Sequence, residues 1–289
     1  MVLARPEEAE EIATDTELAA LGAQLLAERN AITALSDEAA CRLCGARVPL
    51  TPEHAPSRAA GNRGLILGKR VDDEASQATG QLMWTDDEDQ PDGATWESLC
   101  GGCNHRTGRQ FNPSYVAFSE ACEPVALPET AGTRCRIDVV NRPLIAKQAL
   151  VSLIATSQPG LTARYPHLRA LLASASATGT LAPLRLWCHL MANKRGWSTG
   201  LGFTINREQR AGHLFTSFAW WPLGWMLTIG DTTVEGAADV SAWVELRKHS
   251  TPVTVELPCQ WRLIHYPTDF RSPEALRAET GPRHRVTLR

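Results

Sequence analysis

Residues 41–57 read CRLCGARVPLTPEHAPS, and residues 99–108 read LCGGCNHRTG. Each stretch holds a Cys-x-x-Cys turn, and two such turns supply the four sulfur ligands that a tetrahedral zinc site requires. The chain between them is rich in Gly, Pro, Asp and Asn. Such a segment seldom forms its own apolar core, so a cross-link such as a structural metal site would have to stabilise its fold. We expect a structural zinc bound by Cys41, Cys44, Cys100 and Cys103. The alternatives are two unrelated buried turns or a redox couple.

The order of motifs is more informative than either cysteine pair alone. A Cys-x-x-Cys pair is followed by Glu53-His54-Ala-Pro, then by a Trp-Leu stretch that runs into Cys-x-x-Cys-Asn. This order resembles the zinc-stapled branch of the HNH (ββα-metal) endonuclease family over about residues 41–118. The stretch NHRTGRQFNPSYVAF (104–118) is also similar to the tail of uncharacterised bacterial HNH-like proteins. The resemblance implies a β-hairpin followed by a helix.

The resemblance also implies catalytic roles. His54 would be the general base that takes a proton from water, a task suited to an imidazole near neutral pH. Glu53 would bind a catalytic Mg²⁺ or Mn²⁺, and Asn104 would add a neutral oxygen ligand from the first turn of the helix. Three side chains on or near that helix are expected to contact flanking phosphates: His105, Arg106 and Arg109.

Two positions depart from the family pattern. The first acid is usually aspartate, and an asparagine that orients the histidine commonly precedes the leucine before the second cysteine pair; here these positions are Glu53 and Ser98. Two hypotheses about the function therefore remain open. The first is a metal-dependent HNH-type endonuclease that hydrolyses phosphodiester bonds, with DNA as the expected substrate and bacterial defence as a setting by analogy. The second is a non-catalytic zinc-binding module that recognises nucleic acid or protein.

The rest of the chain predicts an α+β fold. A leading helix is expected over 7–34, within an N-terminal region of residues 1–40, and residues 71–93 form an acidic, turn-prone insert. Residues 134–289 are expected to form an α+β domain with an antiparallel sheet, whose role would be regulation, targeting or assembly, with a protein partner or a homo-oligomer. Its helices are predicted at 144–156 and 166–175, and its strands at 184–192, 200–205, 213–221, 224–230, 242–246 and 252–258.

Composition is consistent with a folded protein of one or two domains, since 289 residues include 43% hydrophobic and 21% charged residues. The net charge of −3 offers no general attraction to nucleic acid, so such contacts would need a local patch. The N-terminus lacks a signal-peptide pattern, and no apolar run is long enough to span a bilayer, so we expect a cytoplasmic protein with no membrane partner. The four remaining cysteines are expected to be ordinary apolar residues: Cys122, Cys135, Cys188 and Cys259.

Overall fold

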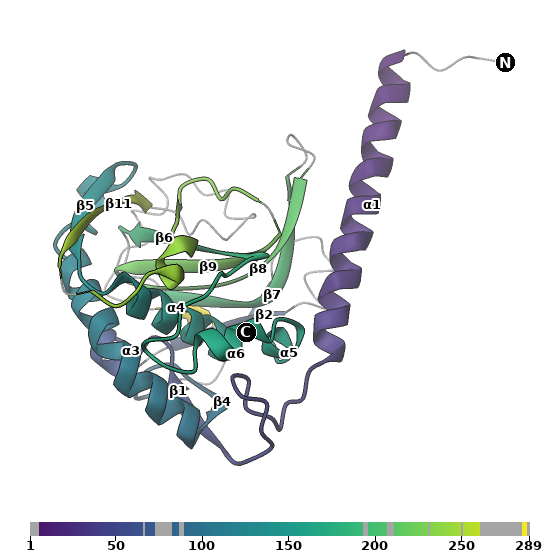
Figure 1. Ribbon diagram of the computed structural model, residues 1–289. Helices are drawn as coiled ribbons and strands as arrows, with labels where there is room; N and C mark the ends of the chain where they lie inside the picture. The colour runs from purple at the N-terminus through teal and green to yellow at the C-terminus, as the bar shows by residue number, and fades with distance from the viewer. Residues whose placement is uncertain are drawn as a thin grey trace.

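The computed structural model describes residues 6–65, 67–72, 83–86, 90–192, 196–206, 211–230, 232–249, 251–260 and 285–287. These residues form a mixed α+β protein in which helices pack against a large sheet, while a separate two-stranded hairpin lies at one end (Figure 1). The expected α+β class is confirmed. Of the acidic insert 71–93, residues 73–82 and 87–89 lie outside the described residues. Among the described helices, none has the length and apolar character needed to cross a bilayer.

The large sheet is mixed. In spatial order its strands are β3 (Met83–Asp86), β2 (Leu67–Asp72), β12 (Arg285–Thr287), β7 (Gly196–Asn206), β8 (Ala211–Trp220), β9 (Leu223–Ile229), β6 (Leu184–Met191), β11 (Val253–Gln260) and β5 (Arg134–Val139), and β10 (Ala238–Asp239) pairs with β6. Most neighbours are antiparallel, as expected. However, β11 runs parallel to β6, and β12 runs parallel to both β2 and β7, so the sheet contains the expected antiparallel pairs together with parallel ones.

The central strands are buried on both faces, which explains their nearly continuous apolar sequences. Along β6, Leu186 and Leu190 join the main core, whereas Trp187 packs with Phe215 and Met226 in a second, smaller cluster. This alternation follows from the two-residue period of a strand. The sheet therefore has a helix-covered face and an opposite face closed by its own aromatic cluster.

Helix α4 (Arg142–Thr156) forms the centre of the helical layer, and its side chains are buried from Pro143 to Thr156. The predicted buried helix at 144–156 is thus confirmed. Lys147 is fully buried, and its Nζ donates to the carbonyls of Ser174 (2.8 Å) and Ala177 (2.6 Å). Burial lowers the pKa of Lys147 to about 8. These bonds hold the 174–177 segment outside helical geometry, and α6 (His167–Leu171), which follows the short α5 (Leu161–Arg164), ends earlier than the predicted 166–175.

One predicted strand is a helical turn. Residues 242–246 were expected to be extended, but η3 (Ser241–Glu245) is a 3₁₀ helix. Val240, just before it, and its buried residues Trp243 and Val244 have the i, i+3, i+4 spacing of a helix, and Asp239 Oδ1 accepts the Ser241 N–H at 2.9 Å. An apolar five-residue run does not by itself distinguish these two structures.

The hairpin consists of β1 (Leu50–His54) and β4 (Thr95–Cys100), which are antiparallel. Helix α3 (Gly101–Cys122) begins directly after β4. The buried face of α3 carries Phe111, Tyr115 and Phe118, which belong to the same continuous core as α4 and the sheet. Trp225 Nε1 of β9 donates to Tyr115 Oη at 3.2 Å, and both residues are buried. Helix α3 therefore joins the hairpin to the large sheet, with η1 (Arg58–Ala60) and η2 (Pro128–Thr130) in the connecting loops.

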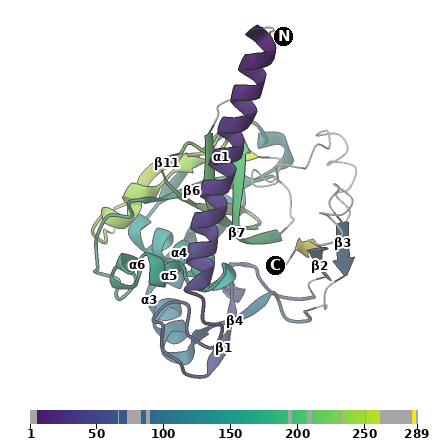
Figure 2. The same cartoon turned by 90° about the vertical axis from the view of Figure 1, so that its right-hand side faces the viewer.

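The leading helix α1 (Pro6–Ala34) matches the prediction closely. Its C-terminal part packs on the molecule through the buried Ile32, and Arg29 Nε donates to Leu201 O of β7 at 2.9 Å. The N-terminal part of the ribbon projects beyond the body in two perpendicular views (Figures 1 and 2). An ion pair between Glu28 and Arg164 at 3.0 Å adds a contact with α5.

We expect Tyr115→Phe to lower the free energy of unfolding by about 1–3 kcal/mol, because it leaves the buried Trp225 indole N–H without an acceptor. Chemical denaturation measures this loss. Tyr165→Phe is the matched control, because the Tyr165 hydroxyl makes only a long 3.4 Å bond to Glu28 Oε1. Equal stability of wild type and Tyr115→Phe would show that the Tyr115–Trp225 bond contributes nothing.

Candidate metal centre and active site

The four motif cysteines converge on one point. Cys41 and Cys44 come from the loop after α1, Cys100 ends β4, and Cys103 lies in the first turn of α3. All four sulfur atoms lie within 4.8 Å of one another, and Cys44 Sγ is 3.9 Å from Cys100 Sγ. A tetrahedron with zinc–sulfur bonds of about 2.3 Å has sulfur–sulfur edges of about 3.8 Å. The donor set therefore fits a metal such as zinc.

Backbone bonds shape the first cysteine turn and fasten it to the hairpin. Cys41 N donates to Ala46 O at 2.9 Å, and Gly45 N donates to Cys41 O at 2.7 Å with Gly45 in the left-handed region at φ 78°. Arg42 N donates to Ser98 O at 2.9 Å. That carbonyl is available because Ser98 is the extra residue of a β-bulge, between the pairs Thr51–Leu99 and Pro52–Glu97. The bulge lets the turn bind the hairpin beside its second cysteine pair.

Electrostatics favour the thiolate form at Cys41, whereas burial raises the pKa of Cys44. The adjacent Cys103 thiol and the nearby backbone N–H groups of Leu43, Cys44 and Cys100 lower the pKa of Cys41 to about 4, against the opposing effect of burial. The same contact raises the pKa of Cys103. Arg106 Nη2 lies 3.6 Å from Cys103 Sγ, where it donates to that sulfur. A deprotonated sulfur is the form that binds metal.

Arg42, inside the first turn, joins the cysteine centre to the core. Its side chain is 16% exposed, and Nη1 donates to Ala155 O at 2.8 Å and also to Ser157 O, at the C-terminal end of α4. Cations are favourable at a helix C-terminus, where carbonyls lack helical partners. Thr162 Oγ1 also donates to Arg42 O at 2.5 Å. The sequence gives no signal for this role, because an arginine between two cysteines is ordinarily solvent-exposed.

The hairpin presents Glu53 and His54 differently. Glu53 pairs with Trp96 and His54 with Thr95, and their side chains leave β1 on opposite faces. Glu53 is only 7% exposed, and its carboxylate has no hydrogen-bond or ion-pair partner among the described residues. Burial raises the pKa of Glu53 to about 7. His54 is partly exposed.

His54 Nε2 lies 2.9 Å from Asp92 O, in the loop before β4. A carbonyl oxygen only accepts hydrogen bonds, so this partner assigns the proton of the neutral ring to Nε2. The lone pair of the imidazole then lies on Nδ1.

Asn104 connects the start of α3 to β1. Its Nδ2 donates to Thr51 Oγ1 and to Pro52 O, each at 3.2 Å. Within the described residues Oδ1 has no hydrogen-bond partner, so the amide oxygen remains available as a ligand. Pro52 precedes Glu53, so the Asn104 amide is attached to the backbone of the residue next to Glu53.

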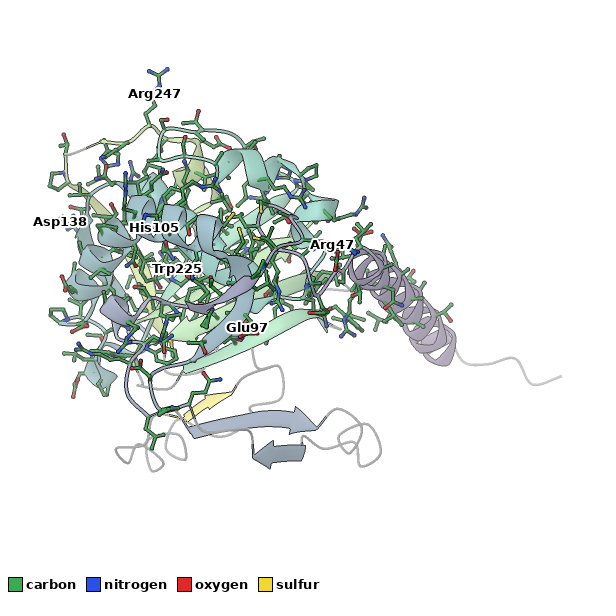
Figure 3. All side chains as sticks on the ribbon, turned by 90° about the horizontal axis from the view of Figure 1, so that it is seen from below. Arg47, Glu97, His105, Asp138, Trp225 and Arg247 are labelled. Atoms are coloured by element: carbon green, nitrogen blue, oxygen red, sulfur yellow. The ribbon has the colours of Figure 1, made fainter. Side chains whose placement is uncertain are left out.

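The three side chains expected to contact phosphate divide into two groups. His105, labelled in Figure 3, and Arg109 are exposed and lie four residues apart on α3, a spacing that puts them on one helical face. Arg106 is instead partly buried and directed to the Cys103 sulfur. Ser98 is fully buried in the bulge, and among the described residues its hydroxyl has no hydrogen-bond partner, so it makes no bond there to His54, which pairs with Thr95.

Sequence reasoning missed a second polar residue besides Arg42. Asn62 is fully buried, in the loop after β1, and its amide bonds three backbone atoms. A single asparagine in a Gly-rich loop ordinarily indicates a turn, so no local signal distinguishes it. Comparison with known proteins finds no matching family model, no similar curated protein and no similar solved structure.

We expect Cys100→Ser to lose the metal of the cysteine centre and to lower thermal stability, because metal binding by four thiolates is coupled to folding of the segments that carry them. Elemental analysis of freshly purified protein should find one zinc per chain in the wild type. Cys122→Ser, which changes a buried cysteine outside the cluster, should retain it. Wild-type protein without any bound metal would contradict the assignment.

Glu53→Gln should stabilise the protein at alkaline pH when no divalent cation is bound at Glu53. The pKa of Glu53 is about 7 in the folded protein against 4.5 ordinarily, so the folded state holds this proton more tightly than the unfolded chain. That contribution is complete below pH 4.5 and is lost as the pH rises to about 7. At pH 8 the variant should gain up to roughly 3 kcal/mol.

Chemical denaturation between pH 4 and pH 8 measures the effect. The buffer contains a weak chelator, which removes free divalent cations but leaves a metal bound by the four cysteines in place. Glu97→Gln is the control, because Glu97 is exposed on the neighbouring strand (Figure 3). Parallel pH profiles for wild type and Glu53→Gln would refute a raised pKa.

Proposed function

We propose that this protein is a metal-dependent, HNH-type endonuclease that hydrolyses phosphodiester bonds in nucleic acid, with DNA as the substrate. The observation that supports the proposal is the pairing of β1 and β4 ahead of α3, with Glu53 and His54 on β1, Asn104 in the first turn of α3 and four converging cysteines on the adjoining segments. Its agreement with the motif order of the HNH family supports the same reading. Zinc at the cysteines would be structural, holding the first turn, β4 and α3 together.

His54 acts as the general base in this mechanism. Its Nε2–H is held by the Asp92 carbonyl, so Nδ1 is free to accept a proton from the attacking water. The partly exposed ring lets a water molecule and a phosphate approach. A backbone carbonyl fixes the tautomer without adding a negative charge next to the substrate phosphate.

Glu53 and the amide oxygen of Asn104 would hold a hard divalent cation, Mg²⁺ or Mn²⁺. Both oxygens are without hydrogen-bond partners within the described residues, and both types of ligand suit such ions. When bound, the ion neutralises charge on the scissile phosphate and the leaving oxygen. Asn104 keeps its amide group in place by donating to Thr51 and Pro52.

Substrate binding would use local positive charge, since the chain as a whole is slightly acidic. The exposed His105 and Arg109 would contact flanking phosphates from α3. Arg106, which donates to Cys103, would instead stabilise the metal centre.

One observation favours a second candidate, a non-catalytic zinc module that binds nucleic acid or protein. Glu53 is nearly enclosed, and its raised pKa leaves the carboxyl largely protonated below neutral pH. A neutral, enclosed carboxyl is a poor ligand for a hydrated cation. The hairpin would then provide a binding surface for nucleic acid or protein and would have no catalytic activity.

Cleavage assays distinguish the two candidates. Wild-type protein is incubated with supercoiled plasmid, single-stranded DNA and RNA, with Mg²⁺ or Mn²⁺. His54→Ala should lower the rate by about 10²–10⁴-fold, since it removes the general base, with little change in melting temperature. His249→Ala is the control, because that ring also bonds a backbone carbonyl (Thr251 O, 2.9 Å) but lies outside the hairpin. Binding without cleavage of any substrate by the wild type would favour the interaction module.

A further inference from the structure

The ring of His54 is oriented by a loop atom. The Asp92 carbonyl that accepts from Nε2 belongs to a segment preceding β4, and Pro91 and Gly93 form only an isolated bridge there. Neither helix nor regular sheet therefore fixes this oxygen. Something else must hold the loop if the tautomer of His54 is to be constant.

Alongside the bond from Thr95 N to Gln90 Oε1 at 2.7 Å, Asn62 makes three of the bonds that hold this loop. Its Nδ2 donates to Pro56 O at 2.9 Å and to Ala94 O at 2.8 Å, while its Oδ1 accepts from Ala94 N at 2.7 Å. Pro56 lies two residues after His54, and Ala94 lies two residues after Asp92. One fully buried amide thus holds both the segment that follows His54 and the segment that follows Asp92.

The neighbouring glycine supports the same arrangement. Gly93 has φ 88°, and a Cβ there would lie 2.5 Å from Asn62 O and 2.7 Å from Asn62 Oδ1. Gly93 N also donates to Gly64 O at 2.8 Å. The loop therefore packs directly onto the backbone and side chain of Asn62, with no room for another residue type.

The ion pair between Arg58 and Asp92 is the competing explanation. Its atoms are 2.6 Å apart, but the two side chains are 55% and 59% exposed. Exposed pairs contribute about 0–1 kcal/mol. Three bonds from a buried amide constrain the loop more strongly, because breaking them leaves buried backbone groups unpaired.

We propose that Asn62 is the positioning residue of His54: it fixes the Asp92 carbonyl and so keeps the His54 proton on Nε2 and the lone pair on Nδ1. This assignment rests on the proposed function for its catalytic meaning, but its structural content is independent of activity. Asn62, in the loop after β1, therefore orients the His54 ring. Ser98 of β4, at the position where the family commonly has an orienting asparagine, does not.

Long-range proton–nitrogen NMR of the full chain labelled with ¹⁵N-histidine tests the proposal. Spectra are recorded at alkaline pH, and the His54 signals are assigned from their loss in His54→Ala. In the wild type, His54 should show a single Nε2–H tautomer. Asn62→Asp keeps the side-chain shape but loses both donated bonds, so His54 should become a mixture of tautomers. Arg58→Ala, which removes the exposed ion pair, should leave the His54 spectrum unchanged.

Matched controls separate this effect from charge and from loss of folding. Asn141→Asp makes the same substitution at an asparagine whose Oδ1 accepts from His249 N at 3.1 Å, and it should leave His54 unchanged. The wild-type spectrum needs no variant to fold. A mixed tautomer in the wild type, or an unchanged His54 spectrum in folded Asn62→Asp, would overturn the assignment.

Activity supplies a second readout. If the wild type cleaves DNA, Asn62→Asp should lower kcat by on the order of 10²-fold with unchanged DNA affinity, since misplacing the base affects only the chemical step. Lost affinity with unchanged kcat would count against positioning. If the wild type cleaves nothing, the proposed function fails, while the NMR spectra still decide whether Asn62 positions His54.

Discussion

Convergence of the four cysteine sulfurs is the constraint on which the hairpin depends. A two-stranded sheet is at best marginally stable alone, and β1 and β4 form such a sheet. The cysteines join a turn before β1 to the end of β4 and the first turn of α3. Glu53 and His54 lie on opposite faces of β1, and Asn104 of α3 bonds Thr51 and Pro52 of the same strand.

The cysteine centre is also coupled to the large sheet. Arg42 bonds the carbonyl end of α4, and α3 carries Cys103 of the four-cysteine cluster near its start and the Tyr115–Trp225 contact further along. Both routes end in the same continuous core. The four-cysteine cluster is therefore connected to the large sheet by two buried routes.

The sequence was informative where the signal is local. Cys-x-x-Cys spacing predicted the sulfur cluster, and apolar periodicity predicted α1 and α4. Non-local partners gave no such signal: the parallel pairing of β11 with β6 depends on residues far apart in the chain, and the 242–246 segment is apolar in either conformation. Arg42 and Asn62 were missed for a related reason. Their partners are backbone atoms, which have no identity in the sequence.

Two asparagine amides fix the backbone on either side of Glu53 and His54. Asn104 donates to the carbonyl of Pro52, and Asn62 donates to that of Pro56. Side chain to backbone bonds thus supply the rigidity that a five-residue strand lacks. Each amide acts locally, on one or two strand or loop residues, whereas the cysteines and α3 connect the hairpin to the rest of the molecule.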